Sequence, residues 1–146
     1  MAISSYLAFA LFAGAMLPIQ FGINAQLATW VGGSIRAAFV SFVVGAAALL
    51  VAVLVAQRGL PDRAGDAPWW VWIGGILGAF YVLGSIVTAP KLGAATLVAL
   101  ILAGQAIASL LVDHYGWVGF EENPITPLRI AGVVLLAGGV ALVRLS

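Results

Sequence analysis

The feature that most constrains this chain is a succession of apolar stretches, each about as long as a helix that crosses a lipid bilayer. Of its 146 residues, 64% are hydrophobic and only 8% are charged. A soluble domain is about one quarter charged, because its outer surface must face water. A bilayer core of about 30 Å needs roughly 20 apolar residues of helix. Backbone groups inside lipid must bond within their own segment, so these stretches are predicted to be helices.

The apolar stretches number five, and we expect an all-α membrane protein with one transmembrane domain over residues 1–146. The expected helices cover about 5–29, 36–56, 68–88, 93–113 and 127–143. The glycines at 32–33 should end the first helix, with Ser34 as the cap of the second. Pro90 is expected to end the third helix, and Thr126 and Pro127 to begin the fifth. The polar stretch 58–63 is expected to be a water-exposed loop.

The basic residues give no preference for one orientation in the membrane. Five spans place the two termini on opposite sides, with three Lys or Arg on each: Arg58, Arg63 and Arg129 against Arg36, Lys91 and Arg144. Orientation normally follows a bias in such residues. Either one loop residue fixes a single orientation, or the chain inserts both ways and pairs head to tail. The second reading gives the inverted-repeat architecture of many transporters, completed by a second copy or by a homologous, oppositely oriented subunit.

Small residues offer places where helices can pack closely. Gly132 and Gly139 lie seven residues apart and therefore share one face of the fifth expected helix. We expect this face to be the dimer contact. Packing within one subunit is the alternative, because such spacings are common in a chain with 18 glycines.

Polar side chains within the apolar spans are costly in lipid and therefore mark candidate functional sites. Gln20 and Asn24 lie one turn apart on the first expected helix, just after Pro18. The missing N–H of Pro18 leaves a backbone carbonyl near Gly14 without its helical partner. We interpret Gln20 and Asn24 as cavity-lining, substrate-binding residues. Bridging between helices is the alternative role.

Further candidates for substrate binding lie on the third and fourth expected helices. They are Tyr81 and Ser85 on the third helix, and Gln105 and Ser109 on the fourth. Tyr81 and Gln105 are the stronger candidates, because neither can satisfy its polar group on its own backbone. A serine in a helix can bond to the preceding turn, which makes Ser85 and Ser109 weaker evidence.

Charged and catalytic groups are scarce in the sequence. No acidic or basic residue lies near the middle of an expected span, and Asp113, at a helix end, is the one candidate for proton coupling. A carboxylate that fixes the helix terminus is its alternative role. The chain has no cysteine and one histidine, so we expect no metal site, no cofactor and no enzyme activity. No basic run is present that would bind nucleic acid.

Several segments resemble one transporter family along essentially the whole chain. They are Gln20-Phe21-Gly22-Ile23-Asn24-Ala25-Gln26-Leu27, Gly104-Gln105, Asp113-His114-Tyr115-Gly116-Trp117, Pro124 to Gly132, and Leu136-Ala137-Gly138-Gly139-Val140. The chain resembles the five-helix, YdcZ-like branch of the drug/metabolite transporter superfamily, a family of inner-membrane exporters. The resemblance implies a bacterial inner membrane, EamA-like halves paired in opposite orientation, and small-molecule transport. The small multidrug resistance relatives carry a glutamate in the first helix, where this chain has Gln20 and Asn24.

We therefore expect a secondary transporter that exports a small polar metabolite as an antiparallel dimer with a midplane site. The neutral amides Gln20 and Asn24 suit a neutral or zwitterionic solute better than a lipophilic cation. A dual-topology ion channel and a non-transporting membrane assembly subunit are the alternatives. A channel would need a continuous polar track along one helix face, whereas the polar residues here form patches. An assembly subunit would have no use for Gln20 and Asn24.

Overall fold

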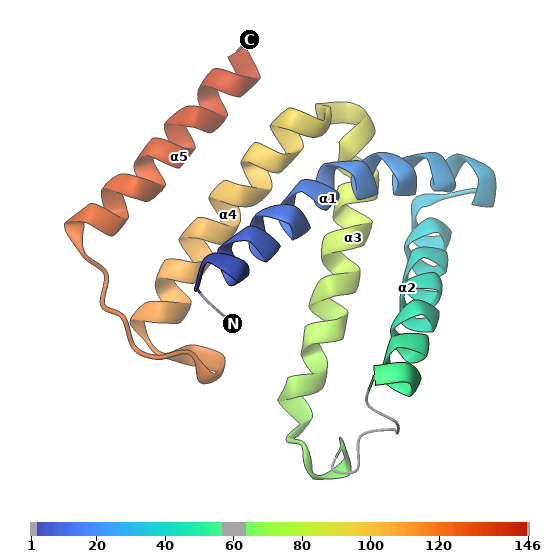
Figure 1. Ribbon diagram of the computed structural model, residues 1–146. Coiled ribbons are helices and arrows are strands. Elements are labelled where there is room, and N and C mark those ends of the chain that lie inside the picture. Colours follow the sequence, from blue (N-terminus) through green and yellow to red (C-terminus); the bar gives the residue numbers. More distant parts are fainter. Residues whose placement is uncertain (1–2, 57–63, 146) are drawn as a thin grey trace. The chain divides into compact units, whose positions relative to one another are not determined.

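The computed structural model describes residues 3–56 and 64–145, and this part of the chain is helical without strands. Its α-helices are α1 (Ile3–Val31), α2 (Ser34–Ala56), α3 (Ile73–Leu92), α4 (Ala94–His114) and α5 (Pro127–Leu145) (Figure 1). Short 3-10 turns are η1 (Ala64–Asp66), η2 (Trp69–Trp72) and η3 (Trp117–Gly119). Five helical segments are long and apolar enough to cross a membrane, and the third of them joins η2 to α3 from Trp69 to Leu92. This result confirms the five expected spans. The loop expected at 58–63 lies outside the described residues.

The turn between α1 and α2 is made by Gly32 and Gly33. The N–H of Gly33 donates to the carbonyl of Ala28 at 2.9 Å, and Gly32 has a φ of +75°. This bond and this left-handed glycine form a Schellman motif, which ends α1. The expected cap at Ser34 is wrong: Ser34 is the first residue of α2, and the carbonyl of Gly33 accepts the first helical bond from Ala37.

The boundary expected at Pro90 is also wrong, because α3 continues through Pro90 to Leu92. The fixed φ of proline is itself helical, so a proline in the last turn costs mainly the one bond that it cannot donate. Gly93 alone separates α3 from α4, and its φ of +75° belongs to a backbone region that glycine adopts most readily. The conformation of Gly93, and not the ring of Pro90, ends the helix.

The start of α5 agrees with the sequence prediction. Pro127 is the first residue of the helix, and the backbone N–H of Arg129 donates to Oγ1 of Thr126 at 3.3 Å. Thr126 thereby satisfies one of the N–H groups that a helix leaves free at its beginning.

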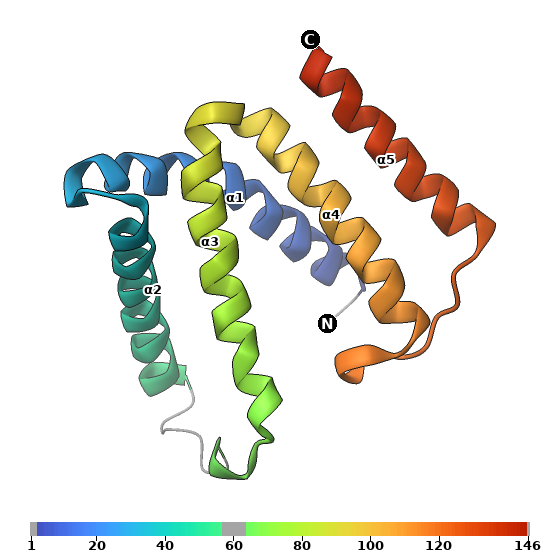
Figure 2. The same cartoon turned by 180° about the vertical axis from the view of Figure 1, so that it is seen from behind.

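The chain forms two compact units, Met1–Lys91 and Leu92–Ser146. In the first unit α1 packs along α2, and a buried cluster of Ala37, Ala38, Val82 and Ile86 joins α2 to α3. In the second unit α4 and α5 run antiparallel, side by side in both views (Figures 1 and 2). The expected single domain stays a prediction.

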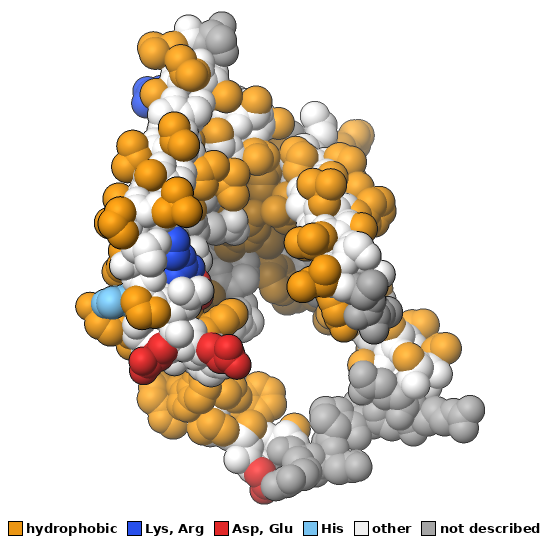
Figure 3. Space-filling view, turned by 60° about the vertical axis from the view of Figure 1, so that its left-hand side comes forward, with side chains coloured by type: hydrophobic (Ala, Val, Ile, Leu, Met, Phe, Trp, Pro, Cys, Tyr) orange, Lys and Arg blue, Asp and Glu red, His pale blue; other side chains and the backbone are white. Residues whose placement is uncertain are grey.

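The outer surfaces of these helices are apolar. Phe80 is 77% exposed and Leu135 is 76% exposed. Hydrophobic side chains cover most of the helical surface visible in Figure 3. Such a surface is stable against lipid acyl chains and not against water.

Candidate functional site

Asn24 is the most deeply buried amide of the described chain. It lies on α1 with 4% of its surface exposed, and its Nδ2 has no hydrogen-bond partner within the part of the chain that the structure describes. A buried donor left without an acceptor costs about 1–3 kcal/mol. Native structures avoid this cost unless the group has a use, so the amide of Asn24 is a candidate ligand contact.

Tyr81 on α3 carries a second unpartnered polar atom. Its Oη is buried and likewise has no hydrogen-bond partner among residues 3–56 and 64–145. The ring of Tyr81 meets the ring of Phe21 edge to face, with centroids 6.1 Å apart and an interplanar angle of 62°. Phe21 is 1% exposed and lies three residues before Asn24, on the same side of α1. The Phe21–Tyr81 contact therefore brings α3 against the part of α1 that carries Asn24.

These two groups define what the region can bind. The Nδ2 of Asn24 donates hydrogen bonds, whereas the hydroxyl of Tyr81 both donates and accepts. The neighbouring ring of Phe21 is apolar. Each of the two groups can donate a hydrogen bond to a carbonyl, carboxylate or hydroxyl oxygen without supplying a net charge.

Gln20, one turn before Asn24, lines a cavity of about 260 Å³ within the same unit. Ser41 and Gly45 of α2, whose side chains are small, and Val82 of α3 also line this space. The cavity is lined by Gln20, Ser41, Phe42, Gly45, Ala46, Leu49 and Val82. A polar amide thus faces a space large enough for a small molecule.

The remaining predicted polar residues differ in how far they are free to bind. Ser85 is buried on α3, but its Oγ donates to the carbonyl of Val82 at 2.8 Å. Ser109 is exposed on α4 and donates to the carbonyl of Ala106 at 3.0 Å. Gln105 is exposed on the same helix. Gln105 and Ser109 belong to the second compact unit, and their part in substrate binding stays a prediction.

Asp113 organises the connection between α4 and α5. Its carboxylate Oδ2 accepts a hydrogen bond from Nη2 of Arg129 in an ion pair. Its backbone carbonyl accepts from the N–H of Asn123 at 2.7 Å, and Nη1 of Arg129 donates to the carbonyl of Asn123 at 2.8 Å. The backbone carbonyl of Asp113 and the guanidinium of Arg129 thereby hold Asn123 of the loop, while the carboxylate of Asp113 joins the ends of both helices through Arg129.

Each charge of this pair sits where the helix dipole disfavours it. Asp113 lies in the last turn of α4, and Arg129 in the first turn of α5. An anion at a helix C-terminus and a cation at an N-terminus are both unfavourable, so each needs the other nearby. The geometry fits the helix-terminus role of Asp113, while its role in proton coupling stays a prediction.

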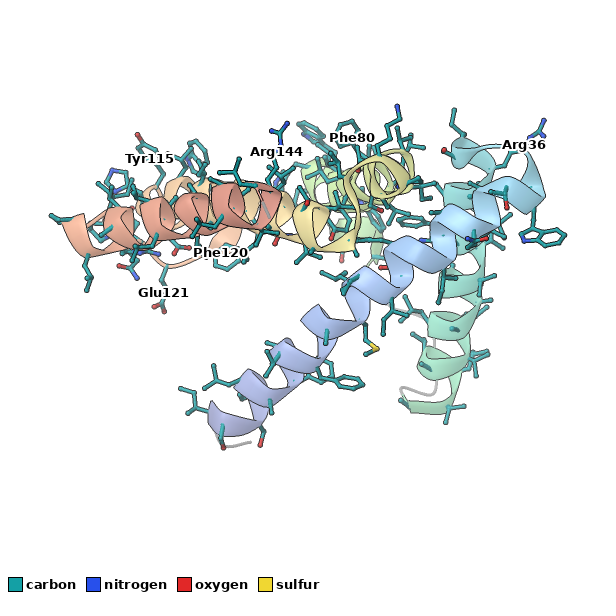
Figure 4. The ribbon with its side chains drawn as sticks, turned by 90° about the horizontal axis from the view of Figure 1, so that it is seen from above. Arg36, Phe80, Tyr115, Phe120, Glu121 and Arg144 are labelled. Atoms are coloured by element: carbon teal, nitrogen blue, oxygen red, sulfur yellow. The ribbon has the colours of Figure 1, made fainter. Side chains whose placement is uncertain are left out.

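The loop itself is tightly wound around Gly116. Gly116 has a φ of +59°, and a Cβ there would lie 2.8 Å from Cγ of Glu122. His114 contributes its Nδ1, which accepts from the N–H of Ile125 at 3.3 Å. In Figure 4 Tyr115 and Glu121 point to opposite sides of this loop. Phe120 lies on the same side of the loop as Glu121 (Figure 4).

Gly132 and Gly139, the predicted dimer contact, line a groove between α4 and α5. The groove has a volume of about 340 Å³ and includes Ala99 and Leu102 of α4. A Cβ placed on either glycine would meet no atom within 4 Å. The glycines therefore leave open space beside α4, and the dimer contact stays a prediction.

Two features of the site were not expected from the sequence. Phe21 was not singled out, because an aromatic residue in an apolar helix carries no distinguishing signal. The pairing of Asp113 with Arg129 spans 16 residues, although their unfavourable positions at helix ends could have indicated it. Within the described residues no group of three or more His, Cys, Asp or Glu could hold a metal ion.

Comparisons with known proteins agree along the chain. The family model described as "Putative inner membrane exporter, YdcZ" matches residues 5–142. The inner membrane protein YdcZ of Escherichia coli (strain K12) is 31% identical over 145 residues, which covers 94% of this chain and 93% of that protein. No solved structure gives a significant match.

Proposed function

This chain belongs to the YdcZ family of inner membrane exporters within the drug/metabolite transporters, and on that premise we propose that it exports a small, polar, neutral or zwitterionic solute. It is a multi-pass protein of the bacterial inner membrane. We place the substrate contact at Asn24, Tyr81 and Gln20 of the first compact unit.

The buried, unpartnered Nδ2 of Asn24 is the observation that carries this proposal. Its cost of about 1–3 kcal/mol would be removed by a solute that offers an acceptor oxygen. The unpartnered hydroxyl of Tyr81 adds a second contact on the facing helix. Neither group carries a charge, so a lipophilic cation would lose its hydration there without gaining a counter-ion.

A thermal-shift screen on the purified protein tests the proposal. The panel contains amino acids, small amides and polyols, with tetraphenylphosphonium as the lipophilic cation. Loss of one hydrogen bond to the ligand should weaken binding of a stabilising solute by about 5- to 150-fold in Asn24→Ala. Gln26→Ala is the matched control, because Gln26 is an exposed amide on the same helix. Stabilisation by tetraphenylphosphonium alone, or equal loss in both variants, would exclude the site.

We further propose that two chains work as an antiparallel pair with a shared midplane site. The equal distribution of Lys and Arg over the two sides supports insertion in both orientations. A chain of five spans cannot divide evenly into two inverted halves, so the inverted partner would be a second chain. Each copy would then contribute one set of the contacts around Asn24.

Cysteines added at the two ends of the chain test this pairing. An impermeant thiol reagent applied to one side of the membrane should label each end in part of the population. Complete protection of one end, in cells that contain no oppositely oriented homologue, would rule out the antiparallel pair without affecting the binding site proposed for Asn24.

A further inference from the structure

A second cavity of the first compact unit faces outward between α2 and α3. It has a volume of about 540 Å³, and all of its lining residues are apolar. Phe39 and Ile35 of α2 border it on one side, and Ile76, Phe80 and Leu83 of α3 on the other. Phe39 and Phe80 are 68% and 77% exposed, so the groove opens outward along the two helices.

Two cations lie at one end of this groove. The helices α2 and α3 run in opposite directions, so the beginning of α2 lies at the same end as the close of α3 (Figures 1 and 2). Arg36 follows Ile35 in the first turn of α2. Lys91 lies eleven residues after Phe80 on α3, which is about three full turns and places it on the same stripe of that helix. Figure 4 shows Arg36 and Phe80 pointing to the same side of the first unit.

These cations have spare capacity to bind an anion. Within residues 3–56 and 64–145 neither Arg36 nor Lys91 forms an ion pair with an acidic side chain. Arg36 makes one long hydrogen bond, from Nη1 to the carbonyl of Val31 at 3.4 Å, out of five possible donors. Asp66 lies in η1, between the end of α2 and the start of α3, and therefore at the opposite end of both helices.

The dimensions of the groove fit one leaflet of a membrane. Ile76 and Lys91 are 15 residues apart on α3, which corresponds to about 22 Å at 1.5 Å per residue. A leaflet with its headgroups is about 20–22 Å thick. An acyl chain in the groove would thus place its phosphate near the level of Lys91 and Arg36.

We propose that this groove is a binding site for one anionic phospholipid. An acyl chain lies against Phe39 and Phe80, and the phosphate is bound by the guanidinium of Arg36 and the ammonium of Lys91. Arginine suits this role because its planar fork can donate two parallel hydrogen bonds to a phosphate. A groove that only contacted bulk lipid would bind anionic and zwitterionic phospholipids equally. A preference for the anionic phospholipid therefore distinguishes a specific site from bulk contact.

Native mass spectrometry of the full chain, titrated in detergent at 0.15 M salt, measures the lipid preference. The probes are dioleoyl phosphatidylglycerol and dioleoyl phosphatidylcholine. Each cation near a membrane surface favours an anionic lipid by about five-fold, so the wild type should prefer phosphatidylglycerol by about 5- to 25-fold. Arg36→Gln with Lys91→Gln should reduce the preference to about one. Arg144→Gln is the matched control, because Arg144 lies in the last turn of α5 in the other compact unit and its loss should leave the preference unchanged.

A second variant tests the apolar part of the site. Ala79 lines the groove and is exposed, so Ala79→Trp should fill the space and weaken the binding of both lipids. Equal binding of the two lipids by the wild type, or an equal loss of preference in Arg144→Gln, would overturn the proposal. Undiminished lipid binding by Ala79→Trp would also overturn it, because the acyl chain would then lie elsewhere.

Discussion

Replacement of Asn24 by leucine should affect stability and binding in opposite directions. Leucine has the branching pattern and the number of side-chain heavy atoms of asparagine and carries no polar atom, so we expect the 4%-exposed position to accept it with small shifts of its neighbours. The ligand-free wild type holds the unpartnered Nδ2 of Asn24 at a cost of about 1–3 kcal/mol. Asn24→Leu removes that cost and should raise the apparent Tm by about 2–4 °C for each kcal/mol. The same variant should lose about 5- to 150-fold in affinity for the solute, because the donor is gone.

Thermal unfolding of the purified protein, with and without the solute found by screening, measures both effects. The solute should raise the Tm of the wild type. Asn24→Leu should have a higher Tm than the wild type without solute, and the solute should raise that Tm only slightly. Gln26→Leu serves as the control, because that exposed amide has no burial cost to remove. A Tm of Asn24→Leu below that of the wild type, both without solute, would refute the reasoning. It would show that the amide of Asn24 stabilises the packing of the helices and is not an unused hydrogen-bond donor.

Substitutions at Tyr81, at the Asp113–Arg129 ion pair and on α5 test three further features. Tyr81→Phe keeps the contact with Phe21 and removes only the unpartnered hydroxyl, so solute affinity should fall by about 5- to 10-fold without loss of stability; unchanged affinity would remove Tyr81 from the site. Asp113→Asn and Arg129→Gln should each lower unfolding stability by about 1–3 kcal/mol, and the double variant should lose little more than either alone; additive losses would show that the pair is not coupled. Should export be proton-driven, Asp113→Asn should also abolish its pH dependence. Gly139→Leu should weaken chain pairing in crosslinking experiments, whereas Gly138→Leu, about 100° away on α5, should not; equal effects would remove this groove from the interface.

The helices could be predicted from the sequence because the bilayer fixes their length. Each apolar stretch must be long enough to cross about 30 Å, and glycine and proline mark the connections. The end of α3 was misplaced because a proline in the last turn of a helix loses only one hydrogen bond, which the sequence does not distinguish from a true stop. The conformation of Gly93 decides the boundary, and it depends on the packing of the whole chain.

The candidate site was only partly visible in the sequence. Asn24 could be selected because an amide in an apolar span is conspicuous. The burial of Asn24 and its lack of a partner depend on how α3 approaches α1. Phe21 makes the contact with α3, but an aromatic residue in an apolar helix does not indicate this contact in the sequence. The ion pair of Asp113 and Arg129 closes across a loop, so helix periodicity could not reveal it.

Solute flux through purified protein in liposomes tests the proposed exporter most directly. The solute found by screening should move with saturable kinetics at about 1–1000 molecules per second per pair of chains, a rate ordinary for protein-catalysed steps. Asn24→Ala should lose most of this flux at low solute concentration, while Gln26→Ala should retain it. A flux that rises without saturation far above this range would identify a channel. No flux in the wild type, or equal flux in Asn24→Ala and the wild type, would contradict transport through the site at Asn24.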